Sequence, residues 1–184
     1  KLHIDIRACV IGHVGRFHPQ KNHGFLIDIF YEFLKHHPES ILLLVGDGSG
    51  RAAIRRKINR LGISSHVCFT GSRGDVPDLL QAMDVFVFPS HYEGLGISIV
   101  EAQAAGLPCL ISDTIPAECI VTKHLVVRYD LKKPPDAWAE KITSLLHLPR
   151  KDRTDEIRQA GYDLAQAAEK LETFYAEAKR RKRS

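Results

Sequence analysis

The chain has 184 residues, of which 44% are hydrophobic and 26% charged, and its formal net charge is +4. This composition is ordinary for a soluble globular protein of about one domain, and the length allows a sizeable core. No apolar run approaches the roughly 20 residues that a membrane-crossing helix needs, which excludes such a helix among these residues, and no secretory signal is visible. Because the chain begins with Lys1 and enters a strand-like run almost at once, we expect a fragment whose preceding segment is absent.

The cysteines and the basic residues bear on the cellular compartment in which the chain is expected. Four widely spaced cysteines without a Cys-x-x-Cys pair argue against a disulfide framework or a zinc site and fit a reducing cytosol. The last six positions hold five basic residues. Two interpretations of this tail stay open: a solvated helix end, or a segment attracted to anionic lipid on the cytoplasmic face of a membrane.

Short strand-like runs alternate along the chain with longer amphipathic ones. In chain order we expect strands at 8–14, 41–45, 67–70, 85–89 and 109–112, a short strand at 125–127, and helices at 25–33, 51–61, 76–82 and 97–105. Such alternation is typical of a parallel sheet with helices on both faces. We therefore predict an α/β fold, a Rossmann-like doubly wound parallel sheet.

The pattern becomes wholly helical beyond Pro134. The apolar face of the first helix there has Trp138, Ile142, Leu145 and Leu146. The face of a last helix at 162–179 has Leu164, Ala168, Leu171 and Tyr175. No linker or internal repeat divides the chain, so we predict one domain over residues 1–184, with 134–184 as a C-terminal helical tail.

The loop after the first predicted strand, Gly12 to Asn22, combines glycines with the cations Arg16 and Lys21. In open parallel sheets, ligands bind beyond the carboxyl ends of the strands, where loops lead into helix N-termini. Glycines allow close backbone approach there, and two cations beside a helix N-terminus favour a pyrophosphate. The loop lacks the spacing of a dinucleotide motif or a P-loop, and a tight turn with two surface cations explains it equally well.

A second glycine-rich loop, Gly46 to Gly50, follows the strand at 41–45. Its glycines permit a sharp turn, and Ser49 is placed to cap the following helix. We favour a structural role for this loop over direct ligand contact.

The third loop leads from Pro89 into the helix at 97–105 and has a glutamate at each end, Glu93 and Glu101. The glycines between them leave backbone N–H groups free to point at an anion, and the helix dipole adds to the attraction. Carboxylates accept hydrogen bonds from the vicinal hydroxyls of a sugar or ribose. A structural alternative exists for Glu101, since Ser98-x-x-Glu101 matches a capping box.

Together these motifs resemble the C-terminal, donor-binding domain of family-4 (group 1) glycosyltransferases of the GT-B fold, in the bacterial exopolysaccharide and capsule branch. The resemblance rests on the glutamate-seven residues-glutamate spacing of Glu93 and Glu101, on the opening loop 12–23, and on segments 69–71 and 84–90. It covers nearly the whole chain.

The resemblance implies a role for each candidate residue. Arg16 and Lys21 would bind the donor diphosphate and stabilise the leaving group, while Glu93 would bind hydroxyls of the donor sugar. Glu101 would hold the ribose hydroxyls. The remaining donor-binding positions that the resemblance implies are Gly15, Ser72, Arg73, Gly94, Leu95, Gly96 and Ile97.

The family is retaining and uses no metal for the diphosphate, so the resemblance implies an NDP-sugar donor, with a UDP-sugar expected, and no cofactor. The ten histidines are scattered and most look like surface or loop residues, so no metal site is predicted. The family binds acceptor in an N-terminal domain that this sequence lacks, and catalysis needs both domains. We expect a cytoplasmic enzyme whose present domain alone is inactive and binds no nucleic acid, and attachment to the inner membrane face through the basic tail stays open.

Two other functions stay open. Nucleotide-sugar 2-epimerases share the GT-B architecture, but their acid and base groups would depend on the missing half. A non-catalytic nucleotide-binding module is the other alternative, because a fold alone never proves activity. A glycoside hydrolase using Glu93 and Glu101 is disfavoured, because both carboxylates lie on one wall of the site.

Overall fold

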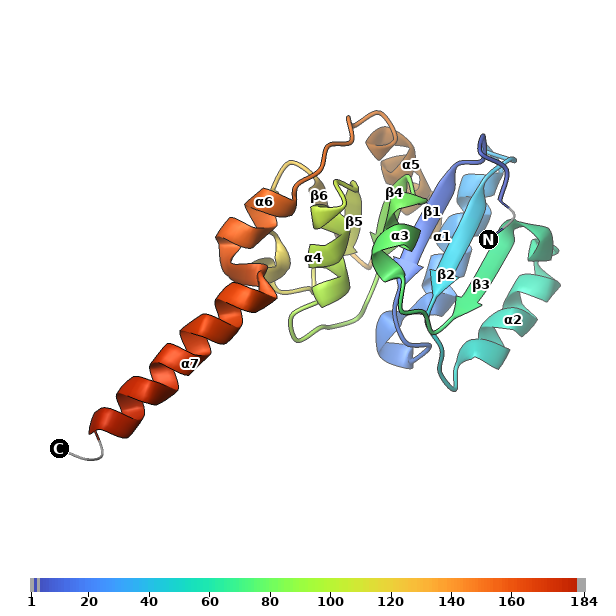
Figure 1. Ribbon diagram of the computed structural model, residues 1–184. Helices are drawn as coiled ribbons and strands as arrows, with labels where there is room; N and C mark the ends of the chain where they lie inside the picture. Colours follow the sequence, from blue (N-terminus) through green and yellow to red (C-terminus); the bar gives the residue numbers. More distant parts are fainter. Residues whose placement is uncertain (1, 3, 182–184) are drawn as a thin grey trace.

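The computed structural model describes residue 2 and residues 4–181 of the chain. Its centre is one sheet of six parallel strands in the order β3-β2-β1-β4-β5-β6 (Figure 1). The strands are β1 Val10–Val14, β2 Ile41–Val45, β3 Val67–Gly71, β4 Val85–Phe88, β5 Cys109–Ser112 and β6 Val126–Tyr129. This confirms the predicted doubly wound α/β fold.

Seven α-helices occur in the described residues. They are α1 His23–Leu34, α2 Arg51–Arg60, α3 Val76–Gln81, α4 Ile97–Ala104, α5 Pro135–Leu145, α6 Thr154–Ile157 and α7 Leu164–Arg181. Helices α1, α2 and α5 share one buried cluster with the sheet, and α3, α4 and α6 share another. Successive residues of β2 therefore pack on opposite faces of the sheet. Leu42 belongs to the cluster with α1, and Leu43 to the cluster with α3 and α4.

Strand order reverses beside β1. The chain runs outward from β1 to β2 and β3, then returns to place β4 on the other side of β1. The loops after β1 and β4 therefore leave the same edge of the sheet as neighbours. A reversal of this kind is where open α/β sheets bind their ligands.

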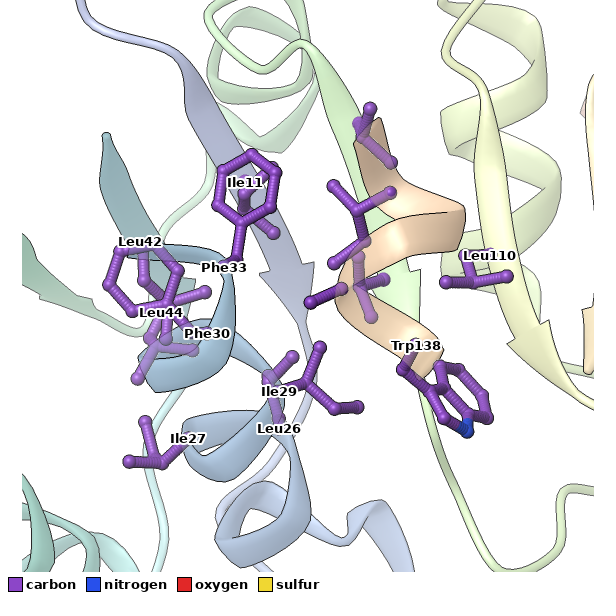
Figure 2. Packing of buried hydrophobic residues seen from close by; sticks show 14 of the residues in the cluster. Ile11, Leu26, Ile27, Ile29, Phe30, Phe33, Leu42, Leu44, Leu110 and Trp138 are labelled. Atoms are coloured by element: carbon purple, nitrogen blue, oxygen red, sulfur yellow. The ribbon is translucent and has the colours of Figure 1, made fainter. Parts of the chain in front are cut away.

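The residues after Pro134, predicted as a helical tail, divide into three parts. Helix α5 belongs to the main core, where its Trp138 is fully buried (Figure 2). The Trp138 ring packs edge-on against Phe25 and Tyr129. Helix α6 packs against α4. Only α7 projects away from the body (Figure 1), and on its predicted apolar face Leu171 and Tyr175 are 56% and 63% exposed.

Element boundaries differ from the predictions by a few residues. Strand β1 begins at Val10 rather than at residue 8, and β6 extends to Tyr129 because its backbone pairs with β5 as far as Ser112. Helix α7 begins at Leu164, because Gly161 with φ 91° breaks the preceding helical turn at 158–162. All four cysteines are free thiols, as expected.

Candidate functional site

The loop after β1 enters α1 through a 3₁₀ turn at Pro19–Lys21. Asn22 ends this turn in the left-handed conformation, with φ 54°, and its N–H donates to the carbonyl of Pro19. Asparagine tolerates this conformation better than most residues. The turn directs the side chain of Lys21 toward the loop after β4.

Lys21 and Glu93 form the central contact of the site. Lys21 Nζ donates to both carboxylate oxygens of Glu93, at 2.8 and 2.9 Å. Only 17% of the lysine side chain and 7% of the glutamate side chain are exposed. The same ammonium lies 4.6 Å from the centre of the Phe88 ring, which adds a cation–π contact. The structure thus brings together two predicted site residues that are 72 positions apart.

Helix α4 begins immediately after this pair. Its N-cap is Gly96 with φ 74°, a conformation that glycine adopts without cost. In the described part of the chain, no backbone carbonyl accepts the amides of residues 93–98. These amides include four of the predicted donor-binding positions, Gly94, Leu95, Gly96 and Ile97. A helix N-terminus with free amides favours a negatively charged group.

The capping-box interpretation of Ser98 and Glu101 is wrong. The helix is capped at Gly96, and no side chain makes a capping hydrogen bond. Ser98 is therefore the second helical residue and cannot serve as the cap. The structural explanation for Glu101 that the sequence left open is removed.

Four other predicted residues line one hollow of about 550 Å³ beside the pair. They are Gly15, Arg16, Ser72 and Arg73, on the loops after β1 and β3. Arg16 is exposed, and within residues 4–181 it has no carboxylate in ion-pair range. Arg73 instead donates from Nε to Asp75 at 2.7 Å. The free guanidinium of Arg16 is therefore the cation available to an anion in this hollow.

The second glycine-rich loop packs against the first, and its Gly46, Asp47 and Gly48 line the same hollow, beside the structural role favoured from the sequence. A Cβ at Gly46 would lie 2.2 Å from the carbonyl oxygen of Gly15, and one at Gly48 would lie 2.7 Å from that of Phe17. The backbone of Phe17 also donates to Asp47, and Gly50 donates to Phe17. Ser49, however, does not cap α2, whose N-cap is Gly50 without a side-chain hydrogen bond.

Glu101 lies apart from the Lys21–Glu93 pair. It is on the side of α4 that faces α3, where it lines a second hollow together with Pro77. Val76, the residue before it, lines the first hollow, so two successive residues of α3 line different hollows. Desolvation raises the pKa of the Glu101 carboxyl above its usual value.

Two histidines of the site were missed from the sequence. His13 and His23 are buried, two exceptions to the expectation that most histidines lie on the surface or in loops, and their rings are 4.7 Å apart edge to face. Burial is the main cause that lowers both pKa values, to about 4 for His23, with the charge of Lys21 contributing to each. His13 Nδ1 donates to the carbonyl of Val87 at 2.9 Å. The neutral ring therefore carries its proton on Nδ1. The sequence contained a signal of burial for one of them, because His13 lies within an apolar run predicted as a strand.

The fold and this edge of the sheet define an α/β domain with a cationic loop facing a helix N-terminus. Residues 3–164 match the family described as "Glycosyl transferases group 1", and the chain belongs to that family.

Three relatives illustrate the similarity. EpsF of Bacillus subtilis (strain 168), named as a glycosyltransferase, is 38% identical over 169 residues, covering 90% of this chain and 44% of EpsF. The Vi polysaccharide biosynthesis protein VipC/TviE of Salmonella typhi is 40% identical over 112 residues, covering 60% of this chain and 19% of the relative. The crystal structure of Anabaena HepE in complex with UDP superposes with a TM-score of 0.73 at 24% identity, covering 92% of this chain and 49% of HepE. The chain thus spans less than half the length of EpsF.

Proposed function

We propose that this chain binds the diphosphate and sugar of a nucleoside diphosphate sugar, with a UDP-sugar as the expected donor, for a retaining hexosyltransferase. The observation that carries this proposal is the Lys21–Glu93 pair beside the free amides of residues 93–98. A cation, an acceptor-only carboxylate and unpartnered N–H groups within one small region match a ligand that has phosphates and hydroxyls at adjacent positions.

Each part of the donor has a group that suits it. Lys21 and Arg16 would neutralise the charge that develops on the departing diphosphate, and backbone amides at the start of α4 would add donors. Glu93 would accept hydrogen bonds from sugar hydroxyls. The hollow lined by Gly15, Ser72 and Arg73 has room for the base, and Glu101, which lines the second hollow, would accept from the ribose.

Metal independence is part of the proposal. An ammonium and a guanidinium can supply the positive charge that a divalent cation supplies to diphosphates in other enzymes. Binding of the nucleotide should therefore be the same with and without a chelator such as EDTA.

The acceptor is proposed to be a cell-surface polysaccharide or a lipid-linked precursor, held by a domain beyond these 184 residues. The similarity to proteins of polysaccharide biosynthesis and the 44% coverage of EpsF support this division of roles. A lipid-linked acceptor would place the enzyme at the inner membrane face, where the basic end of the chain suits anionic lipid. No helix among the described residues is both long and apolar enough to cross a membrane.

Thermal unfolding with added nucleotides tests the proposal. UDP, GDP and ADP, at concentrations up to roughly 10 mM, are compared with the corresponding nucleotide sugars, since even millimolar affinity would then be detected. We expect the unfolding midpoint to rise with at least one diphosphate, and to the same extent in EDTA. An unchanged midpoint with all three nucleotides would refute the donor site.

A further inference from the structure

The segment that carries Glu93, residues 91–95, is loosely packed against the body of the protein. Tyr92 and Leu95 are 60% and 38% exposed, and a Cβ added at Gly94 would meet nothing within 4 Å. Among the described residues, only one amide of residues 91–96 donates to a backbone carbonyl: His91 N–H donates to Gln20 O at 2.8 Å. The position of Glu93 therefore depends on a small number of contacts.

Gln20 makes two of these contacts. Besides accepting from His91 through its backbone, it donates from Nε2 to the carbonyl of Tyr92 at 2.8 Å. The next residue, Lys21, holds Glu93. Residues 20 and 21 thus fasten three consecutive residues, 91 to 93, each by a polar contact.

Gln20 is itself well placed to act as an anchor. Pro19 precedes it in the 3₁₀ turn and fixes one backbone angle of the turn. The turn is closed by hydrogen bonds from Lys21 N–H to His18 O and from Asn22 N–H to Pro19 O, both 3.0 Å long. The side chain of Gln20 therefore starts from a fixed backbone.

We propose that Gln20 is a positioning residue for the sugar end of the donor. It fixes the carbonyl of Tyr92 and so keeps the Glu93 carboxylate where sugar hydroxyls meet it, without touching the donor itself. This inference rests on the proposed function. A carboxylate held in one place loses less conformational freedom on binding than one on a mobile loop, and so binds its hydroxyls more tightly.

The binding test uses Gln20→Met, which keeps the length of the side chain and removes its N–H donor. The ligands are UDP and whichever of UDP-glucose, UDP-galactose and UDP-N-acetylglucosamine wild-type protein binds most tightly. We expect affinity for the UDP-sugar to fall about 5-fold, the cost of ordering the loosened segment when the sugar binds, and that for UDP to change less than about 2-fold. The exposed Gln159, replaced by methionine, is the matched control and should change neither.

A double variant separates positioning from a general loss of structure. If Gln20 acts through Glu93, then Gln20→Met in a Glu93→Gln background should lower UDP-sugar affinity by less than about 2-fold more. An equal loss for UDP and UDP-sugar, or additive losses in the double variant, would overturn the inference.

A ligand-free measurement distinguishes failure of this inference from failure of the proposed function. Amide hydrogen exchange at His91 should become about 5-fold faster in Gln20→Met and stay unchanged in Gln159→Met, because loss of the side-chain bond frees the segment. Unchanged exchange at His91 would overturn the anchoring role whatever the nucleotides do. If wild-type protein binds no nucleotide while exchange at His91 responds, the proposed function fails and the anchor stands.

Discussion

The ammonium of Lys21 contacts both carboxylate oxygens of Glu93, at 2.8 and 2.9 Å, across the gap between the loops after β1 and β4. The proposed function assigns these two groups to different parts of one ligand, the cation to phosphate and the carboxylate to sugar. In the free protein they neutralise each other in a largely buried position. A bound donor would give each group a second partner without leaving either charge unpaired.

Removing the lysine and removing the glutamate charge should affect the binding of UDP and of UDP-sugar differently. Lys21→Ala is expected to weaken UDP binding by 1–3 kcal/mol, roughly 5- to 150-fold, the usual loss for a hydrogen bond to a charged group. Glu93→Gln removes the competing negative charge, so UDP should bind at least as tightly while UDP-sugar binding weakens. Calorimetric titration of both variants gives the answer. Parallel losses of UDP affinity in both would contradict the separate roles.

The double variant Lys21→Met/Glu93→Gln tests whether the pair is coupled in the fold. Lys21→Met alone leaves a buried carboxylate unpaired and should lower the free energy of unfolding by about 3 kcal/mol. In the double variant both side chains are neutral, so no buried charge lacks a partner. Most of the lost unfolding free energy should therefore be recovered, as measured by urea unfolding. UDP binding should stay weak. Additive destabilisation would mean that the two groups do not interact.

Most of the fold could be predicted because each strand is a short apolar run between loops that contain glycine or charged residues. Cys109–Ser112 and Ile41–Val45 were placed without error for this reason. The end of β6 was missed because backbone pairing with β5, rather than hydrophobicity, carries the strand through Arg128 to Tyr129.

The site was predicted less completely, because its contacts depend on strand order. Arg16, Lys21 and Glu93 could be named from local chemistry. The Lys21–Glu93 contact, however, requires β1 and β4 to be neighbours, which periodicity alone does not fix. The buried positions of His13 and His23 were missed because the histidine side chain suits both surface and core.

The contact between the two glycine-rich loops predicts a large difference between glycine variants. Gly46→Ala places a Cβ 2.2 Å from the Gly15 carbonyl oxygen at φ 135°, so the backbone of the β1 loop must shift. We expect a loss of about 3 kcal/mol in unfolding free energy, together with weaker UDP binding. Gly74→Ala, where a Cβ meets nothing within 4 Å, is the matched control and should be nearly neutral. Similar urea midpoints for the two variants would argue against the loop contact.

The buried histidines predict how stability depends on pH. Burial, aided by Lys21, lowers the pKa of His23 from 6.5 to about 4, so the unfolded chain binds more protons between these values. The stabilising effect is full above pH 6.5 and is lost as the pH falls, by about 2 kcal/mol at pH 5 for this group. His23→Phe, which keeps a ring against Phe17, should reduce this pH dependence of urea unfolding. If the unfolding free energy of His23→Phe depended on pH as steeply as that of wild type, the buried neutral state of His23 would be contradicted.

Helix α7 should add little to the stability of the domain. Leu171, Phe174 and Tyr175 are 56%, 64% and 63% exposed, so they bury little area against the body. A chain ending at Asp163 is expected to unfold within about 2 °C of the full chain. Truncation before α5, which removes the buried Trp138, should prevent folding. A large loss on removing α7 alone would mean that its apolar face is covered in solution.

Nuclear magnetic resonance mapping of UDP binding tests the central claim most directly. In a ¹H–¹⁵N spectrum we expect the largest shifts at the amides of Gly15, Arg16, Ser72 and residues 94–97, and their loss in Lys21→Ala. Shifts confined to another hollow, such as the one between α1 and α5 lined by Phe33, His37 and Thr143, would contradict the account. So would the absence of any shift at roughly 10 mM UDP, a concentration that detects even millimolar affinity.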